Sequence, residues 1–166
     1  MRQFFKKENF KVRVFTLFML SAILLVALSG CSSKDNIPNP SVSEIGEKIA
    51  ETVDLSDMKE LDDNKLQKLY GINPDKIDEY WGLIPASNIN AQEILVIKVK
   101  DPADIKQVEE KISERVNEQR ESFKDYLPEQ CFLIEQYVLK HKGNYVFLAI
   151  SKDLNPVEDT FDSFFK

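Results

Sequence analysis

Tyr145–Ile150 (YVFLAI) is apolar at every position, and this uninterrupted run constrains the architecture more than any other segment. Side chains alternate between the two faces of a strand, so both faces of this strand are apolar. One face carries Tyr145, Phe147 and Ala149, and the other carries Val146, Leu148 and Ile150. A strand of this kind needs cover on both sides. We expect a long helix to cover one side and other helices of the same chain to cover the second, with a partner protein as the alternative.

The segments around this strand predict an antiparallel sheet. The sequence Lys142-Gly143-Asn144 predicts a turn, which pairs residues 145–151 with residues 137–140 as a hairpin. Residues 93–100 (EILVIKVK) are a strong strand candidate, and residues 80–87 are a weaker one. Short turns between paired strands favour an antiparallel arrangement of about four strands.

Helix signals flank the predicted strands. The longest helix is expected over residues 102–126, where Asp101-Pro102 matches an N-cap followed by proline at the first helical position. Its inner stripe recurs at spacings of three and four and consists of Ile105, Val108, Ile112, Val116, Gln119, Phe123 and Tyr126. Shorter helices are predicted over about residues 42–53 and 61–70, and a last one begins at Asn155-Pro156. Residues 129–136 fit a helical turn or an extended chain.

This order of elements predicts an α+β fold. A small antiparallel sheet of about four strands packs against one long helix, with short N-terminal helices and a C-terminal helix. With 43% hydrophobic and 30% charged residues, the composition excludes a disordered tail and a disulfide-rich scaffold.

The charge of the chain changes after residue 30. Residues 1–30 contain five of the 22 Lys and Arg residues and one of the 28 Asp and Glu residues. The remaining 136 residues therefore carry a formal net charge of −10. Nucleic-acid binding needs clustered Lys and Arg against the phosphates, so we expect no nucleic-acid partner. Anionic lipid headgroups should also repel so acidic a body.

The first thirty residues match an export signal. An uncharged, largely apolar segment of fifteen residues, Val14–Leu28, follows a positive region. The positive residues are Arg2, Lys6, Lys7, Lys11 and Arg13. The apolar segment is short for a membrane-spanning helix, which needs about 20 residues. It ends in Leu28-Ser29-Gly30-Cys31, which resembles the lipobox of bacterial lipoproteins. In that motif the cysteine thiol is diacylglycerylated, and signal peptidase II cuts just before the cysteine, here between Gly30 and Cys31.

These features divide the chain into three predicted parts. Residues 1–30 are a signal peptide that is removed, residues 31–40 are the lipidated cysteine and a flexible tether, and residues 41–166 are a single α+β domain. Two acyl chains such as palmitate hold a protein stably at a membrane. We therefore expect a lipid-anchored protein at the extracytoplasmic face of the cell membrane, with the membrane as a partner through Cys31. The alternative is an uncleaved anchor helix with an incidental cysteine.

Residues 57–152 resemble a known bacterial lipoprotein family. The pieces that carry the resemblance are Leu69-Tyr70-Gly71-Ile72, Ala91–Asp101, Arg115, Gln119, Phe123, Tyr126-Leu127-Pro128 and Lys142-Gly143-Asn144-Tyr145. The family is catalogued as domain of unknown function 4358 and is found largely in Firmicutes. The resemblance implies a small exported lipoprotein held at the plasma membrane, and it implies no activity.

Residues suited to catalysis or metal binding are scarce. His141 lies beside a predicted turn, and no motif supplies an orienting carboxylate or a nucleophile, so we expect an exposed turn histidine. Cys131 is the only thiol left once Cys31 is lipidated. Its apolar neighbours favour burial, and a reactive thiol at a helix start is the alternative. A structural zinc site needs about four Cys or His ligands, so we expect neither a metal nor a cofactor.

Five residues are candidate contacts with a partner or a ligand. Arg115 and Gln119 lie one turn apart on or beside the apolar stripe. An arginine at the stripe edge can pair with a glutamate, and a polar contact in a ligand groove or partner interface is the alternative. We expect Phe161, Phe164 and Phe165 in the core, with an exposed adhesive patch or a membrane-facing edge as the alternative.

The sequence leaves the function open between classes. The first hypothesis is a non-catalytic binding or protein-interaction module, with an envelope protein as a candidate partner. The second is a small cell-envelope hydrolase that uses a pair of Asp or Glu residues. The 27 acidic residues after position 30 are too many for the sequence to show which two would form that catalytic pair. A solute receptor for a transporter is a minor third, because such receptors usually close two domains around the ligand.

Overall fold

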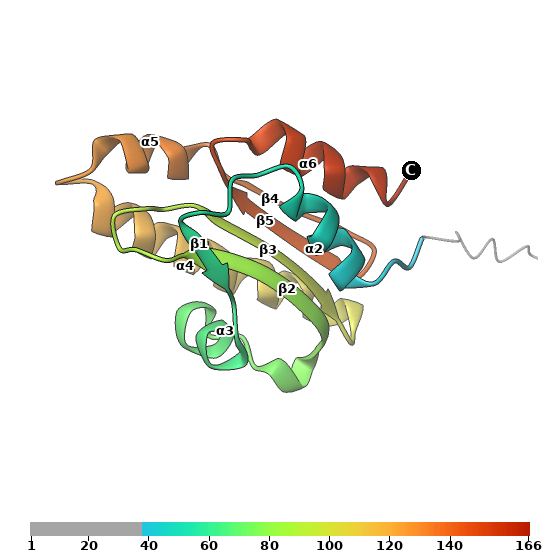
Figure 1. Cartoon of the computed structure of the whole chain (residues 1–166). Helices are drawn as coiled ribbons and strands as arrows, with labels where there is room; N and C mark the ends of the chain where they lie inside the picture. The colour runs from blue at the N-terminus through green and yellow to red at the C-terminus, as the bar shows by residue number, and fades with distance from the viewer. Residues whose placement is uncertain (1–37) are drawn as a thin grey trace, which may run out of the picture. The chain divides into compact units, whose positions relative to one another are not determined.

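The computed structural model describes residues 38–166 (Figure 1). The described chain forms an antiparallel sheet in the order β1-β2-β3-β5-β4. The strands are β1 (Met58–Glu60), β2 (Ile77–Pro85), β3 (Glu93–Val99), β4 (Val138–Lys142) and β5 (Tyr145–Ile150). The predicted signal peptide, Cys31 and most of the predicted tether lie outside the described residues.

The α-helices of the described residues begin and end largely where the sequence places them. They are α2 (Val42–Ala50), α3 (Asp63–Tyr70), α4 (Ile105–Phe123), α5 (Pro128–Glu135) and α6 (Leu154–Ser163). The Ser41 hydroxyl accepts a hydrogen bond from the Glu44 amide and caps α2. Gly71, with φ of 62°, ends α3 in the left-handed conformation that favours glycine. No helix within residues 38–166 combines the length and apolar character that crossing a bilayer requires.

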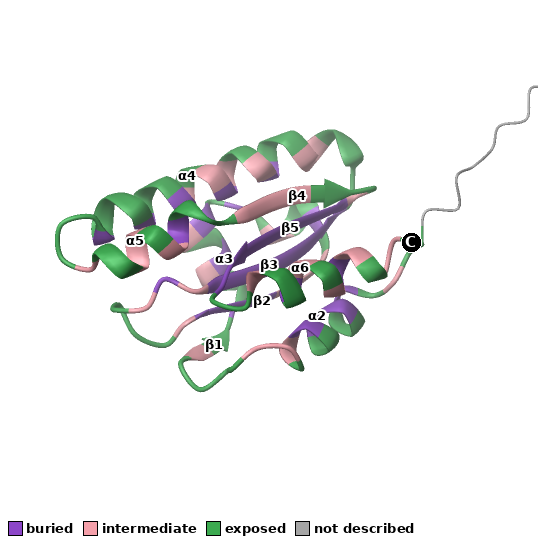
Figure 2. Ribbon diagram, turned by 90° about the horizontal axis from the view of Figure 1, so that it is seen from above, coloured by how far each residue is buried: buried purple, intermediate pink, exposed green. Residues whose placement is uncertain are grey.

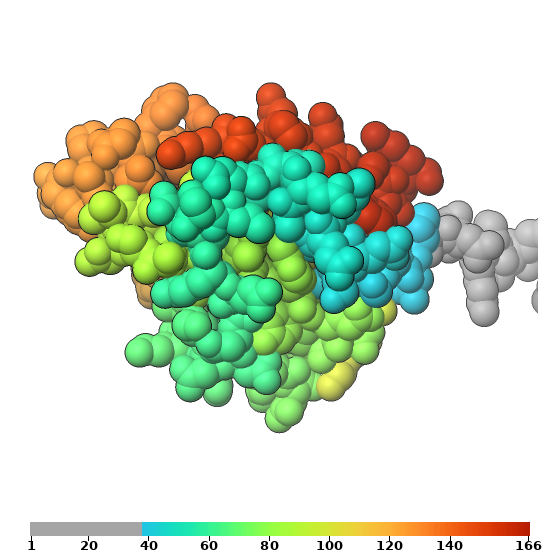
Figure 3. All heavy atoms as spheres, viewed as in Figure 1, coloured from blue at the N-terminus to red at the C-terminus, as the bar shows by residue number. Residues whose placement is uncertain are grey.

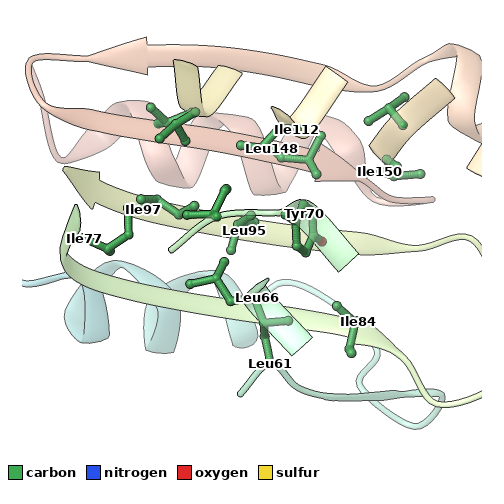
Figure 4. Close-up of a cluster of buried hydrophobic side chains, with 14 of the residues drawn as sticks. Leu61, Leu66, Tyr70, Ile77, Ile84, Leu95, Ile97, Ile112, Leu148 and Ile150 are labelled. Atoms are coloured by element: carbon green, nitrogen blue, oxygen red, sulfur yellow. The ribbon is translucent and has the colours of Figure 1, made fainter. Parts of the chain in front are cut away.

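Both faces of β5 are covered by helices of the same chain, which confirms the expectation drawn from its sequence (Figure 2). One face packs against α3, α4 and α5, and Figure 4 shows Leu66, Leu95 and Leu148 in this cluster. The opposite face packs against α2 and α6, which lie side by side over the sheet (Figure 3). The α+β fold is therefore three-layered, with the sheet in the middle.

Three details differ from the expectation. The sheet has a fifth strand, β1. Its three residues, Met58–Glu60, show no apolar alternation, and they form a strand through their pairing with β2. Residues 128–135 form helix α5, which the sequence left undecided. The long helix is shorter than predicted, because a 3₁₀ turn over Pro102–Asp104 precedes it and it ends at Phe123. Tyr126 is consequently 56% exposed rather than part of the inner stripe.

The contact between α2 and the sheet leaves no room for a side chain at Gly46. A Cβ atom there would lie 2.3 Å from the indole ring of Trp81 on β2. We expect Gly46→Ala to lower the free energy of unfolding by about 1–3 kcal/mol, although alanine favours a helix. Glu47→Ala, on the exposed side of the same helix, should change it by less than about 0.5 kcal/mol. Denaturant unfolding measures both, and equal values for the two variants would contradict this packing.

Candidate functional site

A buried carboxylate lies at the start of the central strand. Glu93 is the first residue of β3 and is 0% exposed. Alternation along β3 places its side chain on the same face as Leu95 and Ile97, beneath α3 and α4. A buried ionised group costs several kcal/mol unless hydrogen bonds and an opposite charge compensate it, so its partners are informative.

Three donors from two helices surround Glu93. Tyr70 of α3 donates its hydroxyl to Oε2 at 2.7 Å. Oε1 accepts from Nη2 of Arg115 at 2.5 Å and from Nε2 of Gln119 at 2.7 Å. We call these four residues the Glu93 network. Arg115 and Gln119 are four positions apart on α4, and this spacing places both on the helix face above Glu93.

The protonation states in the network support these hydrogen bonds. Burial raises the pKa of the Tyr70 hydroxyl well above its usual value, and the neighbouring Glu93 charge raises it further. The hydroxyl therefore stays protonated and donates to Glu93. Burial works against the charged form of Arg115, but the charge of Glu93, the hydrogen bond to it and the neighbouring Tyr70 and Glu118 together outweigh burial and raise the pKa of the guanidinium. The network thus holds a fixed pair of opposite charges.

A cleft of about 340 Å³ opens over this network. Glu93 and Arg115 line it together with residues from β1, α3, the end of β2 and the segment that follows β2. The other lining residues are Lys59, Lys65, Lys68, Leu69, Ile84, Pro85, Ala86, Ser87 and Asn88. Lys65 pairs with Asp62 at 2.5 Å. Within residues 38–166, Lys59 and Lys68 make no ion pair. The lining of the cleft therefore combines cationic with apolar side chains.

The network is incompletely satisfied beside this cleft. Nε of Arg115 and Oε1 of Gln119 are buried and have no hydrogen-bond partner among the described residues. Gln119 is only 4% exposed, and the Arg115 side chain is 18% exposed. Buried polar atoms are usually paired in native proteins, and an orphan costs about 1–3 kcal/mol. Two of the three unpaired buried side-chain atoms among residues 38–166 therefore belong to this network, and the third is Oδ1 of Asp162 on α6.

The candidate phenylalanines lie far from this cleft, on the opposite face of the sheet. Phe161 is fully buried and stacks on Phe147 with ring centroids 4.4 Å apart. Phe164 and Phe165 are half-buried and pack against the same cluster. The structure therefore brings Arg115 and Gln119 together and separates them from the three phenylalanines.

His141 and Cys131 are placed differently from each other. His141 is 50% exposed, as expected, but it lies in strand β4 rather than in the turn, and its Nδ1 lies 2.9 Å from Oε1 of Glu109 on α4. That carboxylate contact was not expected. Ser113, one turn further along α4, donates its hydroxyl to the Glu109 carbonyl. Cys131, in the short helix α5, is half-buried rather than buried, and its thiol lies 3.6 Å from the carbonyl oxygen of Arg120. No group of three potential metal ligands occurs in the part of the chain that the structure describes.

Sequence reasoning missed Glu93, Tyr70, Lys59 and Lys68. Glu93 left one signal, because it falls on the same alternation as Leu95 and Ile97 and is therefore an acid on a core face. Nothing in the sequence indicated that Tyr70 binds a carboxylate, since an apolar or aromatic residue often stands before the glycine that ends a helix. The two lysines looked like ordinary surface charges, and only the fold brings them to one cleft.

Comparisons with known proteins give one match. A family model described as a domain of unknown function (DUF4358) matches residues 51–151. The matched segment runs from before β1 to the end of β5 and contains the whole Glu93 network and every residue that lines the cleft. Searches of curated proteins and of solved structures found no match.

Proposed function

Since this chain belongs to the DUF4358 family, a domain of unknown function, we propose its role from its own residues. It is a bacterial lipoprotein, anchored by lipid at the extracytoplasmic face of the cell membrane, and it serves as a non-catalytic binding module. The observation that carries the binding role is the cleft over the Glu93 network.

The amino-terminal sequence supports the anchor. A positive region, an uncharged apolar segment and Leu28-Ser29-Gly30-Cys31 occur in the order that export and lipidation require. Ser29 and Gly30 are small enough for a narrow peptidase site, and Cys31 supplies the thiol for a thioether. Two acyl chains on Cys31 would hold the protein stably, whereas one chain binds only marginally.

The cleft supports binding. Its volume of about 340 Å³ falls in the range of about 300–1,000 Å³ that small-molecule sites occupy. Polar groups in such sites are few and fixed in place by hydrogen bonds. Glu93 is fixed by its three donors, and it fixes Arg115 in turn. The floor of the cleft is therefore rigid before any ligand arrives.

The same contacts argue against a carboxylate-dependent hydrolase. Such an enzyme needs two carboxylates that face one cleft, one of them as an acid. Among the described residues that line the cleft, Glu93 is the only one with a carboxylate, and both its oxygens already accept hydrogen bonds. The grouped glutamates of α4, Glu109, Glu110 and Glu114, line a separate surface depression instead.

The position of the cleft relative to the tether also fits the proposal. The Tyr145 hydroxyl donates to the Pro40 carbonyl at 2.7 Å, and the Val42 amide donates to Glu79 at 2.8 Å, so the chain enters the domain at the start of β2. The cleft lies at the other end of that strand, beside Pro85. Six residues of strand span about 20 Å. An anchored domain would hold its cleft at the end remote from the tether.

The anchor is tested by Cys31→Ala. We expect the wild-type chain in a bacterial host to lose residues 1–30 and to gain the mass of a diacylglyceryl group. The variant lacks the thiol and should accumulate as an unprocessed precursor. Mass spectrometry of the membrane fraction measures both masses, with Cys131→Ala as the control for loss of the other thiol. Normal processing of Cys31→Ala would refute the lipobox.

A further inference from the structure

We infer that the cleft binds a small organic anion, whose phosphate or carboxylate group lies between Lys59, Lys68 and Arg115. This inference rests on the proposed binding function and adds the chemical class of the ligand. It is carried by the local charge, by the unused donors of Arg115 and by the apolar residues that line the cleft.

The local charge of the cleft is opposite to that of the domain. Residues 31–166 carry a formal net charge of −10, yet four cationic side chains line this one cleft. Glu93 offsets Arg115, and Asp62 offsets Lys65. Lys59 and Lys68 remain without a carboxylate partner within residues 38–166. A cleft that concentrates one sign of charge attracts the opposite sign, so the composition of this cleft selects anions.

Arg115 has donor capacity to spare. A guanidinium has five N–H groups in a planar fork that matches the oxygens of carboxylates and phosphates. Within the described residues it makes one hydrogen bond, from Nη2 to Glu93, and its Nε has no partner. A small shift of the side chain toward the cleft would let a ligand oxygen accept from the fork while Glu93 keeps its bond. Binding would then satisfy a donor that is buried without a partner in the free protein.

The apolar part of the lining favours an organic ligand over a bare ion. Leu69, Ile84 and Pro85 also line the cleft, and Ile84 lies beside Lys59 because the two residues pair across β1 and β2. A bare phosphate would leave this apolar surface and most of the volume in contact with water. A ligand with a short apolar or sugar-like body would fill both, and its oxyanion would reach the lysines. A soluble or wall-derived anion and a phospholipid headgroup share this chemistry.

The test is to titrate anionic probes into the full chain in detergent at constant ionic strength and to monitor binding through the amide resonances in NMR spectra. The probes are citrate, glycerol 3-phosphate and monomeric dihexanoyl phosphatidylglycerol, with zwitterionic dihexanoyl phosphatidylcholine, which has no net charge, as the reference. We expect saturable shifts at Lys59, Ser87 and Arg115 with at least one anionic probe and none with the reference. Saturation by phosphatidylglycerol alone would identify a headgroup, and saturation by the other anions a soluble source. Either result supports the inference.

The matched variants are Lys59→Gln/Lys68→Gln and Lys142→Gln/Lys152→Gln. All four lysines are exposed, so both pairs should fold and both remove two positive charges. We expect the first pair to weaken binding at least about tenfold and the second to leave it within about twofold, because charge-assisted hydrogen bonds are lost only in the first. Equal affinities, or no saturable shift with any anionic probe, would overturn the inference. If Lys59→Gln/Lys68→Gln still retains a ligand that co-purifies with the wild-type protein, the inference of an anionic ligand is wrong and the proposed binding function is not affected.

Discussion

Glu93→Ala is expected to lower the free energy of unfolding by about 3–5 kcal/mol, because it leaves a buried charge without its partner. Arg115 would keep its guanidinium in a site where the side chain is only 18% exposed, and Tyr70 and Gln119 would each lose an acceptor. Urea unfolding followed by circular dichroism measures the change. A loss under about 1 kcal/mol would mean that Arg115 reaches water when Glu93 is absent.

Two control variants separate the charge from the shape of Glu93. Glu93→Gln keeps the size of the side chain and one acceptor oxygen but removes the negative charge, so we expect a smaller loss than for alanine. The double variant Glu93→Leu/Arg115→Met removes both charges together. Replacing a buried ion pair with apolar residues is often close to neutral, so the double variant should be more stable than Glu93→Ala.

Phe161→Ala is expected to cost about 3–5 kcal/mol through the cavity that it leaves. Phe161 is fully buried between α6 and the sheet. The centroid of its ring lies 4.4 Å from that of Phe147 and 5.0 Å from that of Phe165. Phe164→Ala, at a half-buried ring on the same helix, is the matched control and should cost less than half as much. Similar losses for the two variants would show that α6 is not fixed to the sheet by Phe161.

The part of the fold that follows from local periodicity could be predicted from the sequence. Tyr145–Ile150 is apolar on both faces, and the prediction that helices of the chain cover both is confirmed. Strand β1 could not be predicted, because Met58–Glu60 has no apolar alternation and exists only through its pairing with β2. Helix α5 was ambiguous because its apolar residues do not gather on one side.

The candidate site was predictable only in part. The position of Arg115 beside the apolar stripe predicted a glutamate partner, and the spacing to Gln119 placed both on one helix face. The identity of that glutamate depends on the pairing of β3 beneath α4, which brings together residues 22 and 26 positions apart. Lys59 and Lys68 reach the cleft from a strand and a helix that have no common pattern in the sequence. Long-range contacts of this kind leave no trace in local spacing.

The most direct test of the central claim, a lipid-anchored module that holds a ligand in its cleft, is native mass spectrometry of the protein extracted from bacterial membranes. We predict a chain that begins at Cys31, carries a diacylglyceryl group and retains a non-covalent ligand. That ligand should be kept by Lys142→Gln/Lys152→Gln and lost from Lys59→Gln/Lys68→Gln. A chain that still begins at Met1, or a processed chain that retains no ligand in any variant, would contradict the account.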